Sequence, residues 1–125
     1  MIKFAMVGLG GALGAICRYI TYEICLILIK NAWLPIGTMT VNIGGCFIIG
    51  LLGGLAETRN LFSPDIRALI FIGFLGSFTT FSTFGFETVS LIRSGQTGVA
   101  LANVLIQVIA GLAAVSAGLF ITKLL

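Results

Sequence analysis

Four long apolar stretches alternate with short segments that hold most of the charged residues. The stretches cover approximately residues 4–29, 34–56, 68–86 and 95–122. Each is long enough for a helix that crosses about 30 Å of hydrocarbon, which takes about 20 residues. Strands of a membrane barrel would instead alternate apolar and polar residues over about 10 positions, and the chain shows no such alternation. The pattern predicts an all-α integral membrane protein with four transmembrane helices, in which residues 1–125 form a single transmembrane domain.

The composition supports a membrane protein and leaves no room for a soluble domain. Hydrophobic residues make up 58% of the chain and charged residues 9%, against roughly 25% charged residues in soluble domains. The apolar run that follows Lys3 has features of a signal peptide, but Arg18 lies inside the longer stretch, so we expect no cleavage. The net charge of +3 is spread over the connections, and we expect no nucleic-acid partner.

Charge placement gives only a weak preference for one orientation in the membrane. With four spans, both termini and the second connection lie on one side, which puts Lys3, Arg59, Arg67 and Lys123 opposite Lys30 and Arg93. Lysine and arginine near the span ends set the orientation of membrane proteins. The small difference therefore indicates that the chain can insert both ways up.

The third stretch is free of charge but rich in hydroxyls. Four of them, at Thr79, Thr80, Ser82 and Thr83, fall within five positions and so point all round a helix. Nearby glycines add to the local weakness of the helix. One interpretation is a break in this helix at membrane depth, which is tolerated where the backbone is buried in protein or lines a wet cavity and where transport sites are built. The alternative is an intact buried helix whose hydroxyls bond to its neighbours.

Two further polar side chains lie inside predicted spans. Arg18 lies near the middle of the first, where a guanidinium is costly unless it is paired or faces water. It is either a structural arginine bonded to carbonyls at a helix break or a collector of anions. Asn42 lies in the second span, on a stripe that it shares with Thr38 at helical spacing. Its amide forms either an interhelical hydrogen bond or a pore-lining donor.

The residue types exclude most kinds of chemistry. The chain has no histidine and no carboxylate that the pattern places deep inside a span, so no nucleophile and base pair is available and an enzyme is not expected. Glu23 and Glu87 fall near the ends of their predicted spans, which argues against a proton relay. The aromatic rings of Phe81 and Phe84, three positions apart, could present their positive edges to an anion, although packing is the usual role of such a pair. Asn103 and Gln107 are one turn apart and could face the third span.

Three motifs together resemble one family. GGALGAICRY at residues 10–19, GTMTVNIG at 37–44, and residues 73–84 with their core TTFSTF closely resemble the CrcB/Fluc family of fluoride channels. The resemblance implies an antiparallel, dual-topology homodimer in the bacterial cytoplasmic (inner) membrane, with a break in the third helix. It implies two pores through which cytoplasmic fluoride leaves passively, which reduces fluoride toxicity. It also implies a central structural sodium ion held by backbone carbonyls.

The resemblance assigns roles to particular residues of this chain. Phe81 and Phe84 match the aromatic pair of the fluoride pore, Asn42 its amide and Arg18 the arginine at its vestibule. The hydroxyls expected along the pore are those of Ser82, Thr83 and Thr38. Carbonyls of Gly76 and Thr79 match the sodium ligands. Ser77 departs from the glycine that many relatives have.

Two other classes of function compete with a channel. A small multidrug-type, proton-coupled antiporter has a similar length, four spans and inverted dimers, but it relies on a glutamate at the centre of the first span, whereas Glu23 comes late in that span. A structural or assembly protein of the membrane would show no ion flux at all.

Overall fold

The computed structural model describes residues 1–59 and 61–124, and in this part of the chain the regular structure is helical. Three spans are single helices, α1 (Ile2–Leu28), α2 (Ile36–Arg59) and α6 (Thr97–Thr122). The third span, Pro64–Arg93, is built from four segments, α3 (Pro64–Arg67), η1 (Ala68–Leu75), α4 (Gly76–Phe78) and α5 (Phe81–Arg93). Among the described residues, four helices are long and apolar enough to cross a membrane. The prediction of a multi-pass, all-α membrane protein is confirmed.

The third span is longer than its predicted range. The sequence pattern suggests residues 68–86, because Glu87 and Arg93 interrupt the apolar run, whereas the helical segments extend from Pro64 to Arg93. Ser63 begins the span as its N-cap, with its side chain accepting a hydrogen bond from the backbone N–H of Ile66. At the other end the helix continues through Glu87, whose Oε1 accepts a hydrogen bond from the hydroxyl of Thr38 in α2.

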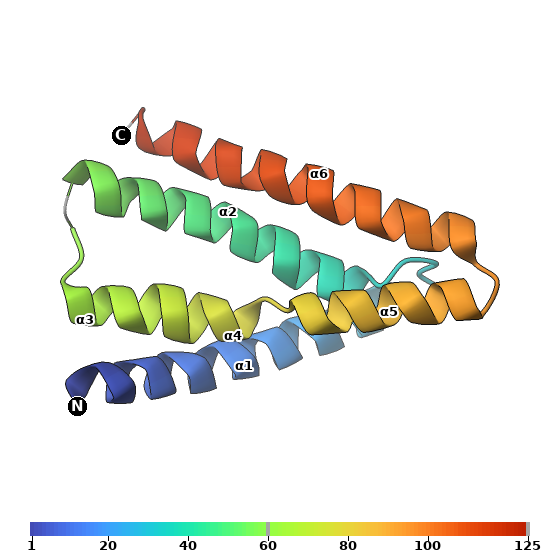
Figure 1. The fold of residues 1–125 in the computed structure, drawn as a ribbon, viewed down its shortest axis with the longest axis horizontal. Helices are drawn as coiled ribbons and strands as arrows, with labels where there is room; N and C mark the ends of the chain where they lie inside the picture. Colours follow the sequence, from blue (N-terminus) through green and yellow to red (C-terminus); the bar gives the residue numbers. More distant parts are fainter. Residues whose placement is uncertain (60, 125) are drawn as a thin grey trace.

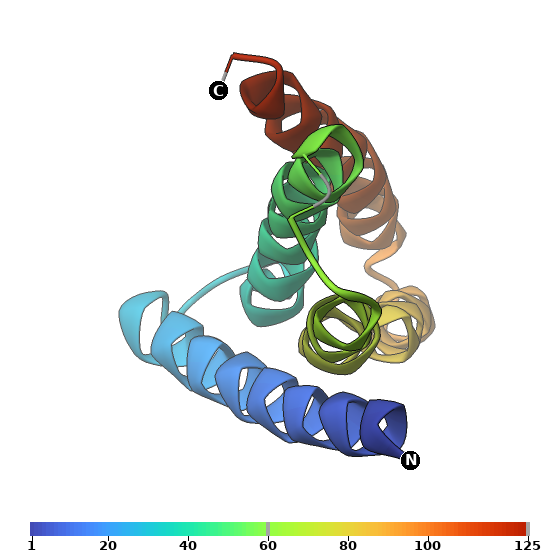
Figure 2. The same cartoon turned by 90° about the vertical axis from the view of Figure 1, so that its left-hand side faces the viewer.

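The spans run alongside one another, with both termini and the α2–α3 connection at one end of the molecule (Figure 1). The α1–α2 and α5–α6 connections lie at the other end. In the view along the spans, α1 and α6 lie on opposite sides, with α2 and the third span between them (Figure 2). The most extensive packing is of α6 on α2 and of α1 on η1.

The contact between α1 and η1 depends on two glycines. A Cβ atom at Gly10 would collide with the carbonyl oxygen of Leu69, and one at Gly14 would collide with that of Phe74. Both glycines are buried. Small residues spaced by four allow this close approach of helix backbones, here against a π-helical segment. The rest of α1 is largely exposed and apolar.

Candidate functional site

Between α4 and α5, two residues of the third span, Thr79 and Thr80, belong to neither helical segment, and we call this short stretch the interruption. Helix α4 ends at Phe78, and the next two residues have extended backbone, with φ −85° and ψ 159° at Thr79 and φ −150° and ψ 116° at Thr80. Helix α5 then begins at Phe81. Thr80 is its N-cap, because the Thr80 side chain accepts a hydrogen bond from the N–H of Thr83 at 3.2 Å.

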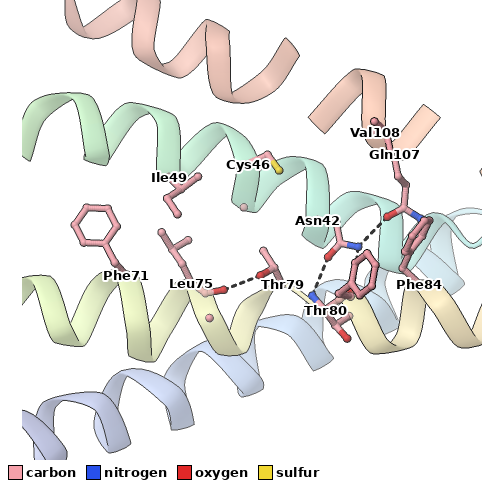
Figure 3. Close-up of a pocket in the computed structure, with 13 residues that line it drawn as sticks. Asn42, Cys46, Ile49, Phe71, Leu75, Thr79, Thr80, Phe84, Gln107 and Val108 are labelled. Carbon is pink, nitrogen blue, oxygen red and sulfur yellow. Dashed lines mark hydrogen bonds between the residues drawn. The ribbon is translucent and has the colours of Figure 1, made fainter. Parts of the chain in front are cut away.

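Asn42 of α2 satisfies both backbone groups of Thr80. The Thr80 N–H donates to Oδ1 of Asn42 at 2.8 Å, and Nδ2 of Asn42 donates to the Thr80 carbonyl at 3.1 Å. Figure 3 shows the Asn42 amide facing this extended segment. An unpaired backbone group costs several kcal/mol in an apolar setting, so one side chain removes two such costs. The amide therefore bonds helices together, which was one of its two predicted roles.

A cavity of about 370 Å³ lies beside the interruption. It is bounded by α2, the third span and α6, and its lining is Asn42, Gly45, Cys46, Ile49, Phe71, Leu75, Gly76, Thr79, Thr80, Phe81, Phe84, Gln107 and Val108 (Figure 3). We call it the first cavity. Among the described residues, no charged side chain lines it. Its polar groups are therefore neutral amides, hydroxyls and backbone groups.

Phe81 and Phe84, two of the three phenylalanines that line this cavity, form an aromatic pair. The ring centroids of Phe81 and Phe84 are 5.5 Å apart with the planes at 49°, a tilted geometry within the range preferred by aromatic pairs. Phe81 is 84% exposed, so its ring packs little against the rest of its own chain. The ring of Phe81 is therefore mostly uncovered at the edge of this cavity, whereas Phe84 is half-buried.

A series of buried amides continues from Asn42 into α6. Nδ2 of Asn42 donates to Oε1 of Gln107 at 2.8 Å, and Nε2 of Gln107 donates to Oδ1 of Asn103 at 2.8 Å. Asn103 then donates to the hydroxyl of Thr88 in α5 at 2.9 Å. The four-residue spacing of Asn103 and Gln107 is visible in the sequence, but their connection to Asn42 depends on how α6 packs on α2.

A second cavity, of about 280 Å³, lies on the α1 side of Thr80. We call it the second cavity, and its lining is Ala15, Arg18, Tyr19, Tyr22, Thr38, Val41, Thr80 and Thr83. Thr38 is almost fully buried and its hydroxyl donates to Oε1 of Glu87 at 2.8 Å. Glu87 therefore lies within α5 and contacts another span. The predicted range for the third span ends at residue 86 and so leaves Glu87 outside it. The one-turn spacing of Glu87 from Thr83 is the signal in the sequence that could have indicated this.

Arg18 reaches from α1 to the interruption. Its Nη1 atom donates to the carbonyl of Thr79 at 3.5 Å, the long end of the hydrogen-bond range. The contact matches the first alternative for Arg18, a structural arginine bonded to a carbonyl. Arg18 also lines the second cavity, so this residue contacts both the cavity and the Thr79 carbonyl.

The structure divides the predicted site residues between the two cavities. The first cavity is lined by Asn42, Gly76, Thr79, Phe81 and Phe84. The second is lined by Arg18, Thr38 and Thr83. Ser82 is exposed and belongs to neither lining as described; its hydroxyl lies 3.2 Å from that of Thr80.

Thr80 lines both cavities, although sequence reasoning gave this residue no role of its own. Its place within the hydroxyl-rich segment is the only signal that the sequence offers. Within residues 1–59 and 61–124, no group of three or more His, Cys, Asp or Glu residues could hold a metal ion. A cation at this site would depend on neutral oxygens such as the carbonyls of Gly76 and Thr79.

Comparison with known proteins gives a consistent result over almost the whole chain. Residues 5–119 match the family described as CrcB-like protein, Camphor Resistance (CrcB). A Methylobacillus flagellatus protein named "Fluoride-specific ion channel FluC" is 40% identical, with the alignment covering 99% of this chain and 97% of the relative. Proteins of the same name from Maridesulfovibrio salexigens and Hahella chejuensis are 41% and 43% identical, over 100% and 95% of this chain and 98% and 93% of theirs. With its four apolar helices and full-length similarity, this chain belongs to the CrcB family.

Proposed function

We propose that this protein is a passive, fluoride-selective ion channel that lets fluoride leave the cytoplasm. The observation that carries the proposal is the first cavity, whose lining combines neutral polar groups with the aromatic pair of Phe81 and Phe84 and, in the described residues, no charged side chain. Full-length relatives named as fluoride-specific channels point to the ion. The role of the channel would be to reduce fluoride toxicity.

Neutral groups suit conduction better than a fixed charge. A small anion needs close contacts to replace its hydration shell, but conduction requires each site to be weak enough for the ion to leave. Aromatic ring edges carry a partial positive charge, and an amide N–H is a neutral donor. An ion close to Asn42 would take the place of Oε1 of Gln107, which now accepts from Nδ2 of Asn42. In the proposal, Phe81, Phe84 and Asn42 form the ion path, and Thr38, Thr83 and Arg18 lie at the second cavity.

The direct test is ion flux from liposomes that contain only the purified protein. We expect rapid fluoride efflux and far slower chloride efflux, with no requirement for a proton gradient. Protein-free liposomes are the control. Chloride efflux equal to that of fluoride would contradict selectivity. The absence of fluoride efflux from liposomes with correctly folded protein would overturn the channel itself.

We also propose that the working unit is a pair of copies in opposite orientations. Three observations support this proposal: the exposed ring of Phe81 at the first cavity, the exposed apolar surface of α1, and the small difference in lysine and arginine count between the two sides. A single labelled cysteine tests it, introduced as Leu61→Cys in a variant that lacks Cys17, Cys25 and Cys46. Reaction with impermeant reagents added to either side of the membrane supports two orientations, and labelling from one side only contradicts them.

A structural sodium ion at the interruption is a further part of the proposal, which interprets the extended Thr79–Thr80 backbone as the expected break in the helix. Two carbonyls from one copy are too few for a cation, but an inverted pair would supply four. Neutral oxygens suit a hard cation, and the Thr79 carbonyl keeps a second lone pair beside its bond from Arg18. Replacing sodium with a large organic cation should lower both flux and thermal stability. Unchanged values of both would refute this site.

The family assignment supports the channel and not the proton-coupled antiporter. It also agrees with the expectation that the protein is not an enzyme, since the relatives are named ion channels. A location in the bacterial cytoplasmic membrane is part of the proposal. Dye export driven by a proton gradient, measured in the same liposomes, would instead favour the antiporter as the function.

A further inference from the structure

The amide series between α2, α6 and α5 forms one continuous chain of hydrogen bonds. It starts at the backbone of Thr80, passes through Asn42, Gln107, Asn103 and Thr88, and ends at the carbonyl of Phe84. Its bonds from Thr80 to Thr88 measure 2.8, 2.8, 2.8 and 2.9 Å, and the last one, to Phe84, measures 2.7 Å. Its two ends therefore lie at the N-cap of α5 and in the first turn of that helix.

The end at Phe84 fixes the direction of every bond. A backbone carbonyl can only accept, so the single proton of the Thr88 hydroxyl is donated to Phe84. The hydroxyl must then accept from the NH₂ group of Asn103. The oxygen of Asn103 is consequently the atom that faces Gln107 and accepts from its NH₂ group. Gln107 is left with its oxygen toward Asn42.

The end at Thr80 fixes the same direction independently. A backbone N–H can only donate, so the Asn42 atom that lies 2.8 Å from it must be the oxygen. The NH₂ group of Asn42 is then free to donate to the Thr80 carbonyl and to Gln107. The two ends agree, which leaves the three amides with a single consistent orientation.

We infer that Asn103 and Thr88 are positioning residues, which hold the amide of Gln107, and through it that of Asn42, in one orientation at the first cavity. Gln107 and Asn42 line that cavity, whereas Thr88 and Asn103 are absent from the lining of both cavities as described. Asn103 is fully buried, so it has no access to water that could replace a lost partner. If the side-chain amide of Gln107 were rotated by half a turn, its NH₂ group would face the NH₂ group of Asn42, and the bond between the two amides would be lost. The inference rests on the proposed function in that ion flux is one of its readouts.

The sharpest variant is Thr88→Val, which keeps the shape of the side chain and removes the hydroxyl. It leaves the NH₂ group of Asn103 without its acceptor, and we expect fluoride flux to fall by roughly ten-fold, the scale of one lost buried hydrogen bond. Thr88→Ser keeps the hydroxyl and should retain flux. The matched control is Thr58→Val, because the Thr58 hydroxyl makes the same kind of bond to a carbonyl four residues earlier, Gly54, at 2.8 Å, yet lies outside the chain of amides.

A double variant separates positioning from general destabilisation. Gln107→Met removes the amide through which Thr88 is inferred to act, so adding Thr88→Val to it should cause no further loss of flux. An additional loss equal to that of Thr88→Val alone would overturn the inference. So would equal fluxes for Thr88→Val and Thr88→Ser, or an equal loss in Thr58→Val.

Hydrogen exchange provides a readout that needs no ion flux. The Thr80 N–H is bonded to Asn42, so loss of the amide orientation in Thr88→Val should raise its exchange rate by roughly ten-fold, while Thr88→Ser and Thr58→Val leave it at the parent rate. An unchanged rate in Thr88→Val contradicts the inference. If the parent protein shows no fluoride flux, the proposed function fails. The exchange rates still decide whether Thr88 and Asn103 position the amides.

Discussion

The two halves of the third span are held by different kinds of contact. Its first half contains η1, which packs backbone to backbone against Gly10 and Gly14 of α1. Its second half begins at the extended Thr80, whose backbone is bonded to the side chain of Asn42. Helices in a membrane lack a hydrophobic driving force between them, so they associate through close packing of small residues or through polar bonds. In this span, close packing of small residues holds the part before the interruption, and polar bonds hold the part after it.

The difference between close packing and hydrogen bonding indicates which half of the span can hold a functional site. Close packing leaves no space, because even one added methyl group at Gly14 would meet the backbone of Phe74. Directional bonds hold groups apart at fixed positions and leave cavities between them, such as those on either side of Thr80. The first half therefore serves as the rigid support, and the second half presents the polar groups.

Removing the polar contact should have the largest effect on stability. Asn42→Leu leaves the N–H and the carbonyl of Thr80 without their partner, and we expect the free energy of unfolding to fall by about 3 kcal/mol. Thermal or denaturant unfolding in detergent measures this. Asn31→Leu, at an exposed position in the α1–α2 connection, is the control and should unfold like the parent. Equal stability of the Asn42 and Asn31 variants would show that the contact is dispensable.

Disturbing the packed half should cost somewhat less. Gly14→Ala places a Cβ against the Phe74 carbonyl, and moving α1 away from η1 should lower stability by about 2 kcal/mol, within the usual range for overpacking. Gly8→Ala is the matched control, since a Cβ there meets no atom within 4 Å. Helix propensity alone favours alanine in both variants. A Gly14 variant as stable as the Gly8 variant would mean that the close approach is not required.

Substitutions in the aromatic pair should lower conduction more than they lower stability. Because Phe81 is 84% exposed, Phe81→Ile removes little packing within the chain and should unfold at the parent temperature. Phe81→Ile and Phe84→Ile each remove a ring edge from the proposed ion path and should lower fluoride flux by roughly 100-fold, about 2.7 kcal/mol on the barrier.

Phe86→Ile is the control for this comparison. Phe86 is an exposed phenylalanine of the same helix, 75% exposed, and is not part of the described lining of the first cavity. Its replacement should leave flux within a factor of about two of the parent, well under 1 kcal/mol on the barrier. Parent-like flux in both Phe81→Ile and Phe84→Ile would assign that pair to packing alone.

Sequence reasoning reached the number and type of the long helices because apolar length is a local property of the chain. It was less accurate at the end of the third span, where Glu87 lies inside the helix and accepts a hydrogen bond from Thr38 of another span. The hydroxyl-rich segment left two alternatives, and the described backbone has features of both. Thr79 and Thr80 are extended, while the Thr79 hydroxyl bonds to the Leu75 carbonyl at 3.0 Å as in an intact helix.

The partners of the polar side chains could not be predicted from the sequence, because they depend on how the spans pack. Asn42 and Gln107 are 65 residues apart, yet their amides are 2.8 Å from each other. A stripe of polar residues indicates which side of a helix faces protein, but not which atom it meets. The resemblance to a family supplied the roles of Phe81 and Asn42, which remain predictions until flux is measured.

The smallest effect is expected at Ser82, although its place in the TTFSTF motif suggested a pore hydroxyl. The structure leaves Ser82 exposed and outside the described lining of both cavities, 3.2 Å from the Thr80 hydroxyl. Thr80 keeps its contacts with Thr83 when Ser82 is shortened, because the Thr83 N–H and hydroxyl lie at 3.2 and 3.0 Å. Ser82→Ala should therefore change stability by no more than about 0.5 kcal/mol and flux by less than about three-fold.

Thr80→Val is the informative partner of Ser82→Ala, because it removes the N-cap of α5 and should lower stability by about 1 kcal/mol. A variant at Ser82 that lowered flux as much as Phe81→Ile would contradict this placement. It would mean that Ser82 faces the ion in the proposed inverted pair, in which a second copy of the protein would cover α5. The polar half of the third span would then extend beyond the two cavities, to the face that a single copy leaves exposed.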